Sequence, residues 1–251
     1  MPRTARKESA STLYHVINRG VGKQIIFEED SDRVFFMRKL YDLLFEEDGF
    51  LLAWCLMDNH FHLLISAELA SLMKLMHRLQ TSYAGYYNKV HEHVGAVFGG
   101  RFKSEPVETD EYLMTVVRYI HENPLKGNIC DSLDYPWSSY REYRNGSAIY
   151  IDPSLVLGVF GGRDQLLAFH NESHGDERCL EFDNASRRGL SDEEAKRLAD
   201  ELLGSGTVGS LKGMERRVRD SALSVLRRNR LSVRQIQRLT GISTGVIAKA
   251  R

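Results

Sequence analysis

The sequence has few cysteines and no long apolar run, and each shortage excludes a class of protein. Its three cysteines, Cys55, Cys130 and Cys179, form no Cys-x-x-Cys pair, which argues against a disulfide framework or a cysteine-rich zinc site. The longest apolar run, Phe50 to Met57, is far shorter than the roughly 20 residues that a membrane-spanning helix needs. The first residues, MPRTARKESAST, lack the apolar core of a signal peptide. We therefore expect a protein of the reducing cytoplasm without membrane contact.

Net charge is also absent, but the zero conceals an asymmetry along the chain. The 251 residues hold 34 Lys and Arg against 34 Asp and Glu. From Lys212 onward 11 basic residues face two acidic ones, so this tail carries +9 and residues 1–211 carry −9. A basic tail on an acidic body is typical of a nucleic-acid-binding appendage, with a solvated basic helix as the alternative.

The hydrophobic pattern predicts strands alternating irregularly with helices. We expect strands at residues 12–18, 50–57 and 60–66, and helices at 30–45, 69–91 and 109–121. Residues 95–107 are interpreted as a loop leading into a strand, and the aromatic segment 135–143 as packing back on the domain. Pro124 should end the third helix, because proline disfavours helical geometry in the residue before it. These features indicate the α+β class, with an antiparallel sheet sandwiched by helices.

The composition changes after about Asn145, where the chain becomes glycine-rich and then acidic. We therefore expect a first domain over residues 1–145, an acidic, mostly helical connecting region over 146–211, and a last unit over 212–251. Residues 205–213 contain three glycines and two serines, which predicts a flexible joint before that last unit.

The last unit has the pattern of a helix-turn-helix. Helices are expected over 220–228, 232–240 and 244–251, with Gly241 at the turn between the last two. The final helix would enter a DNA groove. Phosphate contacts are expected from Arg234, Arg238, Lys249 and Arg251. The alternative is an ordinary helical hairpin.

Two histidines on a predicted strand form the first candidate site. In NHFHLLI, His60 and His62 point to one face of the strand, and the apolar residues between and after them fix the other face in the core. Two imidazoles at this spacing can chelate one divalent ion, given a third ligand. A structural role for both histidines is the alternative.

A tyrosine and an asparagine at the end of a predicted helix form the second. Tyr119 and Asn123 are i and i+4 and therefore share a helix face. The Asn123 carbonyl oxygen suits Mg²⁺ or Mn²⁺, and the Tyr119 hydroxyl is a potential nucleophile. Ordinary core packing of Tyr119 is the alternative.

The motifs together resemble a known family. AWCLMD, NHFHLLI, GRFKSEPVETDEYL, RYIHENPLKG and PWSSY occur in the order and spacing seen in insertion-sequence-type single-tyrosine HUH transposases. The opening YHVINRG and IFEEDSDRVFFMRKL resemble the REP-associated tyrosine transposase subgroup most. The resemblance covers about residues 12–143. The chain departs from the family at Gly99 and Phe102, where Gln and Tyr are more usual.

The resemblance implies a ferredoxin-like HUH domain that nicks and rejoins single-stranded DNA, at hairpin or repetitive palindromic sites. Tyr119 would attack DNA and become linked to a 5′-phosphate, while His60, His62 and Asn123 would bind a divalent ion, Mg²⁺ or Mn²⁺. His121 is an alternative third ligand, although i+2 on a helix faces roughly the opposite side. The last unit is also similar to the DNA-binding helix-turn-helix found at the end of some members of this family.

Five basic residues lie within or beside the motifs, namely Arg19, Arg101, Lys103, Arg118 and Lys126. They are candidates for contacts with the DNA backbone, with solvated surface charges as the alternative. We expect single-stranded or hairpin DNA at the first domain and duplex DNA at the tail.

Two rival functions stay open. One is a non-enzymatic DNA-binding regulator derived from a transposase, although retention of both histidines, the tyrosine and the asparagine argues against a decayed site. The other is a metal-dependent phosphodiesterase that uses water, with Tyr119 merely packing. In each case we expect a monomer or homodimer in a bacterial cytoplasm, associated with the nucleoid.

Overall fold

The computed structural model describes residues 6–172, 179–181, 192–204, 207–229, 231 and 233–249. The chain forms two compact units, Met1–Phe182 and Asp183–Arg251, each with a hydrophobic core of its own. The elements of the first unit are β1 (Leu13–Arg19), η1 (Val21–Lys23), α1 (Asp30–Glu46), β2 (Phe50–Met57), β3 (His60–Ser66), α2 (Leu69–Val90), β4 (Lys103–Pro106), α3 (Asp110–Lys126), α4 (Tyr140–Asn145), α5 (Ser154–Phe160) and α6 (Arg163–Asn171).

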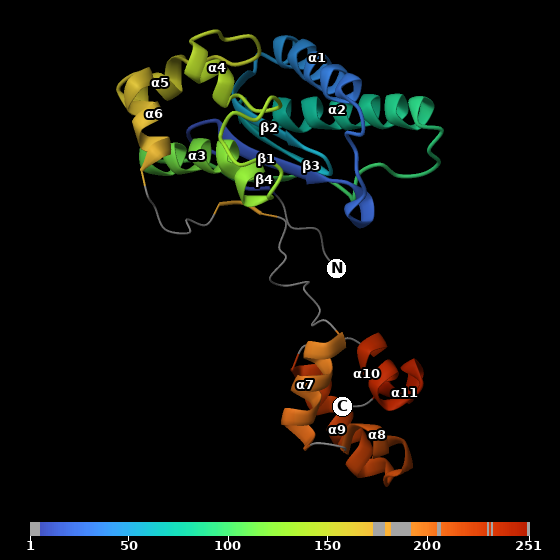
Figure 1. The fold of residues 1–251 in the computed structure, drawn as a ribbon. Helices are drawn as coiled ribbons and strands as arrows, with labels where there is room; N and C mark the ends of the chain where they lie inside the picture. The colour runs from blue at the N-terminus through green and yellow to red at the C-terminus, as the bar shows by residue number, and fades with distance from the viewer. Residues whose placement is uncertain are drawn as a thin grey trace. The chain divides into compact units, whose positions relative to one another are not determined.

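A four-stranded sheet lies at the centre of the first unit (Figure 1). Its strand order is β2-β3-β1-β4, and each neighbouring pair is antiparallel. The chain order β1-α1-β2-β3-α2-β4 is that of ferredoxin-like folds. β2 and β3 form a hairpin in which Met57 pairs with His60. The predicted α+β class and its antiparallel sheet are confirmed.

The two faces of the sheet carry different helices. α1 and α2 lie together on one face, and α3 lies on the other (Figure 1). Phe61 points to the first face, where its ring centroid is 5.0 Å from that of Phe36 on α1. His62 points to the second, where its ring centroid is 5.6 Å from that of Tyr119 on α3. The alternation expected of a strand therefore separates the core side of β3 from its histidine side.

α3, the helix that carries Tyr119, starts at a capped turn and is longer than predicted. The Thr109 hydroxyl accepts the backbone N–H of Tyr112 at 3.2 Å, which caps the first turn. The prediction that the helix ends before Pro124 is wrong, because it continues to Lys126. Pro124 lies in the last turn, where it forgoes only one helical hydrogen bond, and backbone bonds from Gly127 to Asn123 (2.8 Å) and from Ile129 to Pro124 (2.9 Å) hold that turn closed.

The aromatic segment 135–143 packs against β2, as expected. Backbone bonds of 2.9 Å join Leu56 N to Trp137 O and Ser139 N to Trp54 O along this outer strand. α5 and α6 continue within the same unit, and Val156, Phe160 and Leu166 are buried in its core.

The second unit is helical. Its elements are α7 (Asp192–Leu203), α8 (Thr207–Ser210), η2 (Leu211–Gly213), α9 (Arg216–Arg228), α10 (Val233–Thr240) and α11 (Thr244–Lys249). The flexible joint predicted over 205–213 is wrong for residues 207–213, because Val208 and Leu211 are buried in the core of this unit. Gly241, with φ of 67°, separates α10 from α11. Among the described helices, none has the length and apolarity of a bilayer span.

Candidate active site

β3, β1 and α3 bring the predicted nucleophile and the histidine pair together. Tyr119 is only 6% exposed, and its ring lies edge-on to two imidazoles, with centroid distances of 5.6 Å to His62 and 5.9 Å to His15. The ring centroids of His60 and His62 are 5.2 Å apart. The site therefore lies between α3 and the face of the sheet opposite to α1 and α2.

Asn123 completes this group from the turn of α3 that follows Tyr119. Its Nδ2 donates to the Tyr119 backbone carbonyl at 2.9 Å, which leaves Oδ1 as the atom that can act as a ligand. Burial and then the Arg19 charge lower the pKa of His60 to about 4, and a hydrogen bond with Asn123 opposes this shift. A hydrogen bond with Asn123 also opposes the rise in the pKa of Tyr119. The four residues that the sequence singled out thus contact one another.

The Nδ1 atoms of both histidines are engaged by neighbouring side chains. His60 Nδ1 lies 2.7 Å from Asn59 Oδ1, and the Asn59 amide is oriented because its Nδ2 donates to the Lys23 carbonyl at 3.2 Å. His60 Nδ1 must therefore carry the proton, and a metal would meet Nε2. His62 Nδ1 lies 3.1 Å from His15 Nε2, which leaves its Nε2 for the same purpose. Burial holds the pKa of His62 well below its ordinary value, so this ring is neutral at physiological pH.

His15 is a residue of the site that sequence reasoning missed. It lies on β1, is fully buried and contacts both His62 and Tyr119. Burial lowers its pKa to about 3. The motif YHVINRG predicted a strand, but nothing in it indicated that strand register would bring His15 beside His62.

Glu181 is a second residue that sequence reasoning missed. The Tyr119 hydroxyl donates to Glu181 Oε1 at 2.9 Å, and Lys103 Nζ donates to the Glu181 backbone carbonyl at 3.3 Å. Burial is the main cause that raises the pKa of Tyr119, and the Glu181 hydrogen bond and charge raise it further. In this arrangement the phenol keeps its proton.

His121 was the alternative to Asn123 as third ligand. It is fully buried, with Nδ1 2.8 Å from His170 Nε2 and Nε2 2.8 Å from Ser139 Oγ. Both ring nitrogens are therefore engaged away from the histidine pair, which favours Asn123.

Comparison with known proteins identifies the first unit. A sequence model of the family described as "Transposase IS200 like" matches residues 8–123, which include His60, His62, Tyr119 and Asn123. The chain carries an IS200-like transposase domain. This confirms the family that the motifs resemble. A solved structure of "the REP associates tyrosine transposase bound to a REP hairpin" is similar at 13% identity and a TM-score of 0.49, covering 72% of this chain and 100% of that one. No curated protein matches.

Three of the predicted basic residues lie close to the candidate active site of the transposase domain. Arg19 pairs with His60 in the strand register, and its positive charge contributes to the lowered pKa of that histidine. Lys126 Nζ lies 4.8 Å from the centroid of the Tyr119 ring and 3.4 Å from Glu122 Oε2. Lys103 reaches the carbonyl of Glu181, as described above.

Arg101 and Arg118 lie elsewhere. Arg101 is exposed in a groove of about 830 Å³ beside β4, which Arg6 and Lys103 also line. Arg118 is 3% exposed, donates to the Phe169 carbonyl at 3.3 Å and stacks 4.0 Å from the Phe169 ring. A DNA contact from Arg118 has no support in this geometry, which instead gives it a role in holding α6 against α3.

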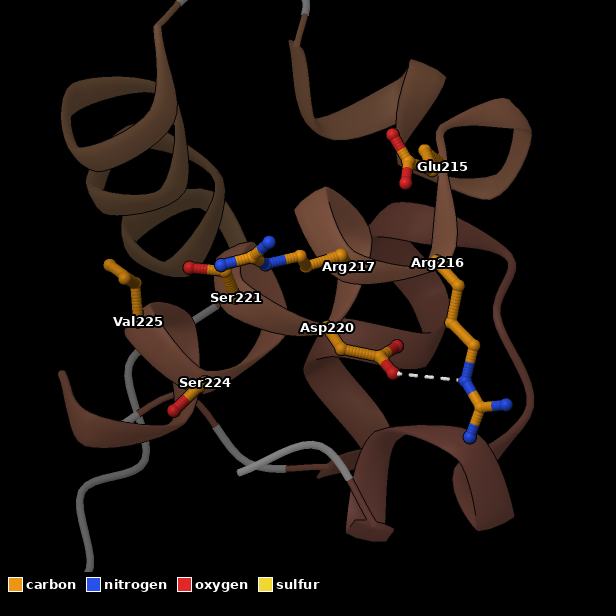
Figure 2. Close-up of a pocket in the computed structure, with 7 residues that line it drawn as sticks. All are labelled: Glu215, Arg216, Arg217, Asp220, Ser221, Ser224 and Val225. Carbon is orange, nitrogen blue, oxygen red and sulfur yellow. Dashed lines mark ion pairs between the residues drawn. The ribbon is translucent and has the colours of Figure 1, made fainter.

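The second unit presents basic side chains that the sequence had not singled out. A shallow depression of about 640 Å³ lies on α9, where Arg216 and Arg217 extend on either side of Asp220 (Figure 2). Arg216 Nε lies 3.6 Å from Asp220 Oδ2. Arg238 is exposed on α10. Arg234 lies on α10 and Lys249 on α11, and their side chains lie outside the described part of the chain, as does all of Arg251.

Proposed function

We propose that the transposase domain nicks and rejoins single-stranded DNA through a covalent bond between Tyr119 and a 5′-phosphate. The observation that carries the proposal is the convergence of Tyr119, His60, His62 and Asn123, which come from a strand and a helix far apart in the sequence. A tyrosine that merely packed would have no need of an adjoining pair of imidazoles, one of them against its ring, and of an amide one helical turn away.

The chemistry requires a leaving group that can return. Tyr119 Oη attacks the phosphorus, its proton leaves, the bond from phosphorus to the 3′-oxygen breaks, and that oxygen takes up a proton as a 3′-OH. The phosphotyrosine ester conserves the energy of the broken bond. Attack by a 3′-OH on the same phosphorus then restores a phosphodiester and releases the phenol, so strand transfer requires no ATP.

The residues present fit a divalent ion. His60 Nε2, His62 Nε2 and Asn123 Oδ1 supply two imidazole nitrogens and one amide oxygen, a set that leaves coordination positions for water and a phosphate oxygen. When bound, Mg²⁺ or Mn²⁺ would neutralise phosphate charge and orient the scissile bond. Arg19, Lys103 and Lys126 would hold the flanking phosphates.

For the second unit we propose duplex DNA binding by a helix-turn-helix made of α10 and α11. Ile236, Ile242 and Ile247 are buried between these helices and their neighbours, and the turn at Gly241 is short. The +9 charge from Lys212 onward supports a polyanionic partner. We propose hairpin or repetitive palindromic DNA as the substrate of the first unit. Such DNA contains both single-stranded segments for cleavage and duplex for binding by the second unit.

A denaturing gel tests the main proposal. The protein, Mn²⁺ and a labelled single-stranded hairpin should give a covalent adduct that survives detergent, and Tyr119→Phe should give none. Cleavage without an adduct would instead identify the phosphodiesterase that uses water. Binding without cleavage would identify the non-enzymatic regulator.

The polarity of the bond is tested with end-labelled substrates. We expect the adduct to carry the DNA downstream of the nick and the released fragment to end in a 3′-OH. An adduct joined through a 3′-phosphate would contradict the proposed polarity.

A further inference from the structure

His15 has no part in the chemistry proposed above, yet it is the most enclosed polar residue beside the site. It is 0% exposed, and its Nε2 lies 3.1 Å from His62 Nδ1. Within the described residues, its Nδ1 is buried without a hydrogen-bond partner. A buried nitrogen without a partner is unfavourable, most of all when it carries a proton.

A single proton between the two rings decides which nitrogen of His62 can bind a metal. In one arrangement His15 Nε2 donates to His62 Nδ1. His62 then carries its own proton on Nε2, so this nitrogen has no lone pair with which to bind a metal. In the other, His62 Nδ1 donates to His15 Nε2, and the lone pair of His62 lies on Nε2. The second arrangement places the proton of His15 on Nδ1, which has no partner among the described residues, so it costs free energy that a ligand on His62 Nε2 must offset.

We propose that His15 is a positioning residue that accepts the Nδ1 proton of His62 and thereby directs the Nε2 lone pair of His62 to the metal. The inference rests on the proposed function, since it assumes that His62 is a ligand. His15 is not itself a ligand of the same ion, because its Nε2 is engaged by His62 Nδ1. Hydrogen bonds behind a ligating histidine generally fix its tautomer and orientation.

The rings of His15 and His62 both lie beside the ring of the proposed nucleophile, Tyr119. Tyr119 lies edge-on to both, at interplanar angles of 70° to His15 and 70° to His62. A change in the tilt of the His62 ring would therefore alter the surroundings of the phenol. His15 thus couples the orientation of the ligand to the position of Tyr119.

A matched pair of variants separates acceptance of the proton from the filling of space. In His15→Gln the side-chain carbonyl can reach the position of Nε2 and accept from His62, whereas the ring of His15→Phe fills the site without an acceptor. Mn²⁺ alone is titrated into the full chain, and electron paramagnetic resonance measures the unbound ion. We expect His15→Phe to weaken Mn²⁺ binding by about 10-fold to 100-fold. His15→Gln should stay within about threefold of the wild type. Circular dichroism checks that each variant is folded.

A measurement on the unmodified protein covers the case in which a variant does not fold. Long-range ¹H–¹⁵N correlation spectra report which ring nitrogen is protonated, and with saturating Mg²⁺ we expect His62 to carry its proton on Nδ1. Mn²⁺ binding by folded His15→Phe equal to that of the wild type, or a proton on His62 Nε2 with Mg²⁺ bound, would overturn the role of His15 alone. Failure of the wild type to bind Mn²⁺ would overturn the metal site of the proposed function, and this inference with it.

Discussion

The hydroxyl of Tyr119 donates to Glu181 Oε1 at 2.9 Å, so a carboxylate occupies the space in front of the proposed nucleophile. The phosphate of a DNA strand would have to approach the same oxygen. Two negative groups at such a distance repel each other, most strongly where water is excluded. Glu181 must therefore move, or be neutralised, before Tyr119 can attack.

Replacing Glu181 by Gln should accelerate adduct formation near neutral pH. The variant loses a charge that repels phosphate and that, after burial, helps to raise the pKa of Tyr119. We expect a gain of about threefold or more in the initial rate, measured as phosphotyrosine adduct against time. The rise of this rate with increasing pH should also move to lower pH.

The chain offers a matched control on the same helix. Tyr112 donates to Glu105 Oε2 at 2.8 Å, so Glu105→Gln removes an equivalent charge from a tyrosine that the mechanism does not use. It should leave the rate near that of the wild type. Slower adduct formation by Glu181→Gln would show that the carboxylate assists the reaction instead.

The two proposed histidine ligands should differ in their contribution to stability. Both face α3, but His62 is 2% exposed and bonded to His15, whereas His60 is only partly buried. His62→Ala should lower the free energy of unfolding by about 2 kcal/mol, because it leaves a cavity and a buried nitrogen without its partner. His60→Ala should cost less than about 1 kcal/mol. Urea unfolding measures both, and each variant should fail to form the adduct; adduct formation by either would remove that residue from the ligand set.

Acid should destabilise the metal-free protein through its buried histidines. Burial lowers the pKa of His60 to about 4 and that of His15 to about 3, below the ordinary value of about 6.5. Between these values the unfolded chain binds protons that the folded chain does not, so stability falls as pH drops from about 7 to about 4. Each such histidine contributes up to about 1.4 kcal/mol per pH unit in this window.

Urea unfolding at about pH 7 and about pH 5 measures this loss. His15→Gln should make stability less dependent on pH, because one buried histidine is gone. His77→Gln, at an exposed position on α2, should leave the dependence as in the wild type. A pH dependence unchanged by His15→Gln would contradict the assignment of this loss to the buried rings.

Removal of the second unit should separate bond breakage from affinity. A chain that ends at Phe182 keeps the sheet, α3 and Glu181, and both units have their own cores. We expect it to form the adduct at low salt but to bind DNA at least about tenfold more weakly near physiological salt, with a shallower slope of log affinity against log salt. If the folded truncated chain cannot be trapped on DNA at any salt, the second unit belongs to the active site.

Arg118 should behave as a structural residue. Arg118→Met loses the hydrogen bond to the Phe169 carbonyl and the stacking on its ring, so we expect a loss of about 1–2 kcal/mol in the free energy of unfolding. DNA affinity should change by less than about twofold. Lys126→Met should do the reverse, weakening DNA binding at nearly constant stability. Mobility-shift titrations and urea unfolding on the two variants decide between the roles.

The predictable part of the site depends on local geometry. His60 and His62 share a face because side chains on a strand alternate, and Tyr119 and Asn123 share one because a helix repeats every 3.6 residues. Neither relation requires knowledge of the rest of the fold. The strands and helices around them follow from the same periodicities.

The parts that were missed depend on contacts between distant segments. His15 reaches His62 only because β1 pairs with β3 in a particular register, and Glu181 reaches Tyr119 from 62 residues away. Glycines at 206, 209 and 213 suggested a joint, but the burial of Val208 and Leu211 overrides the flexibility that glycine allows. The division of labour between the two ends of the chain stays a prediction.

The backbone bonds along β2 bear on whether this edge of the sheet can pair with a strand of another molecule. An outermost strand ordinarily presents a row of unsatisfied amides and carbonyls that a strand of another molecule can pair with. Here Leu56 N, Trp54 O and Leu51 O are already bonded to Trp137, Ser139 and Asp152 of the same chain. That border of the sheet is therefore closed to growth by strand addition, and the short segment that closes it protects a strand of eight mostly apolar residues from fibril-like pairing.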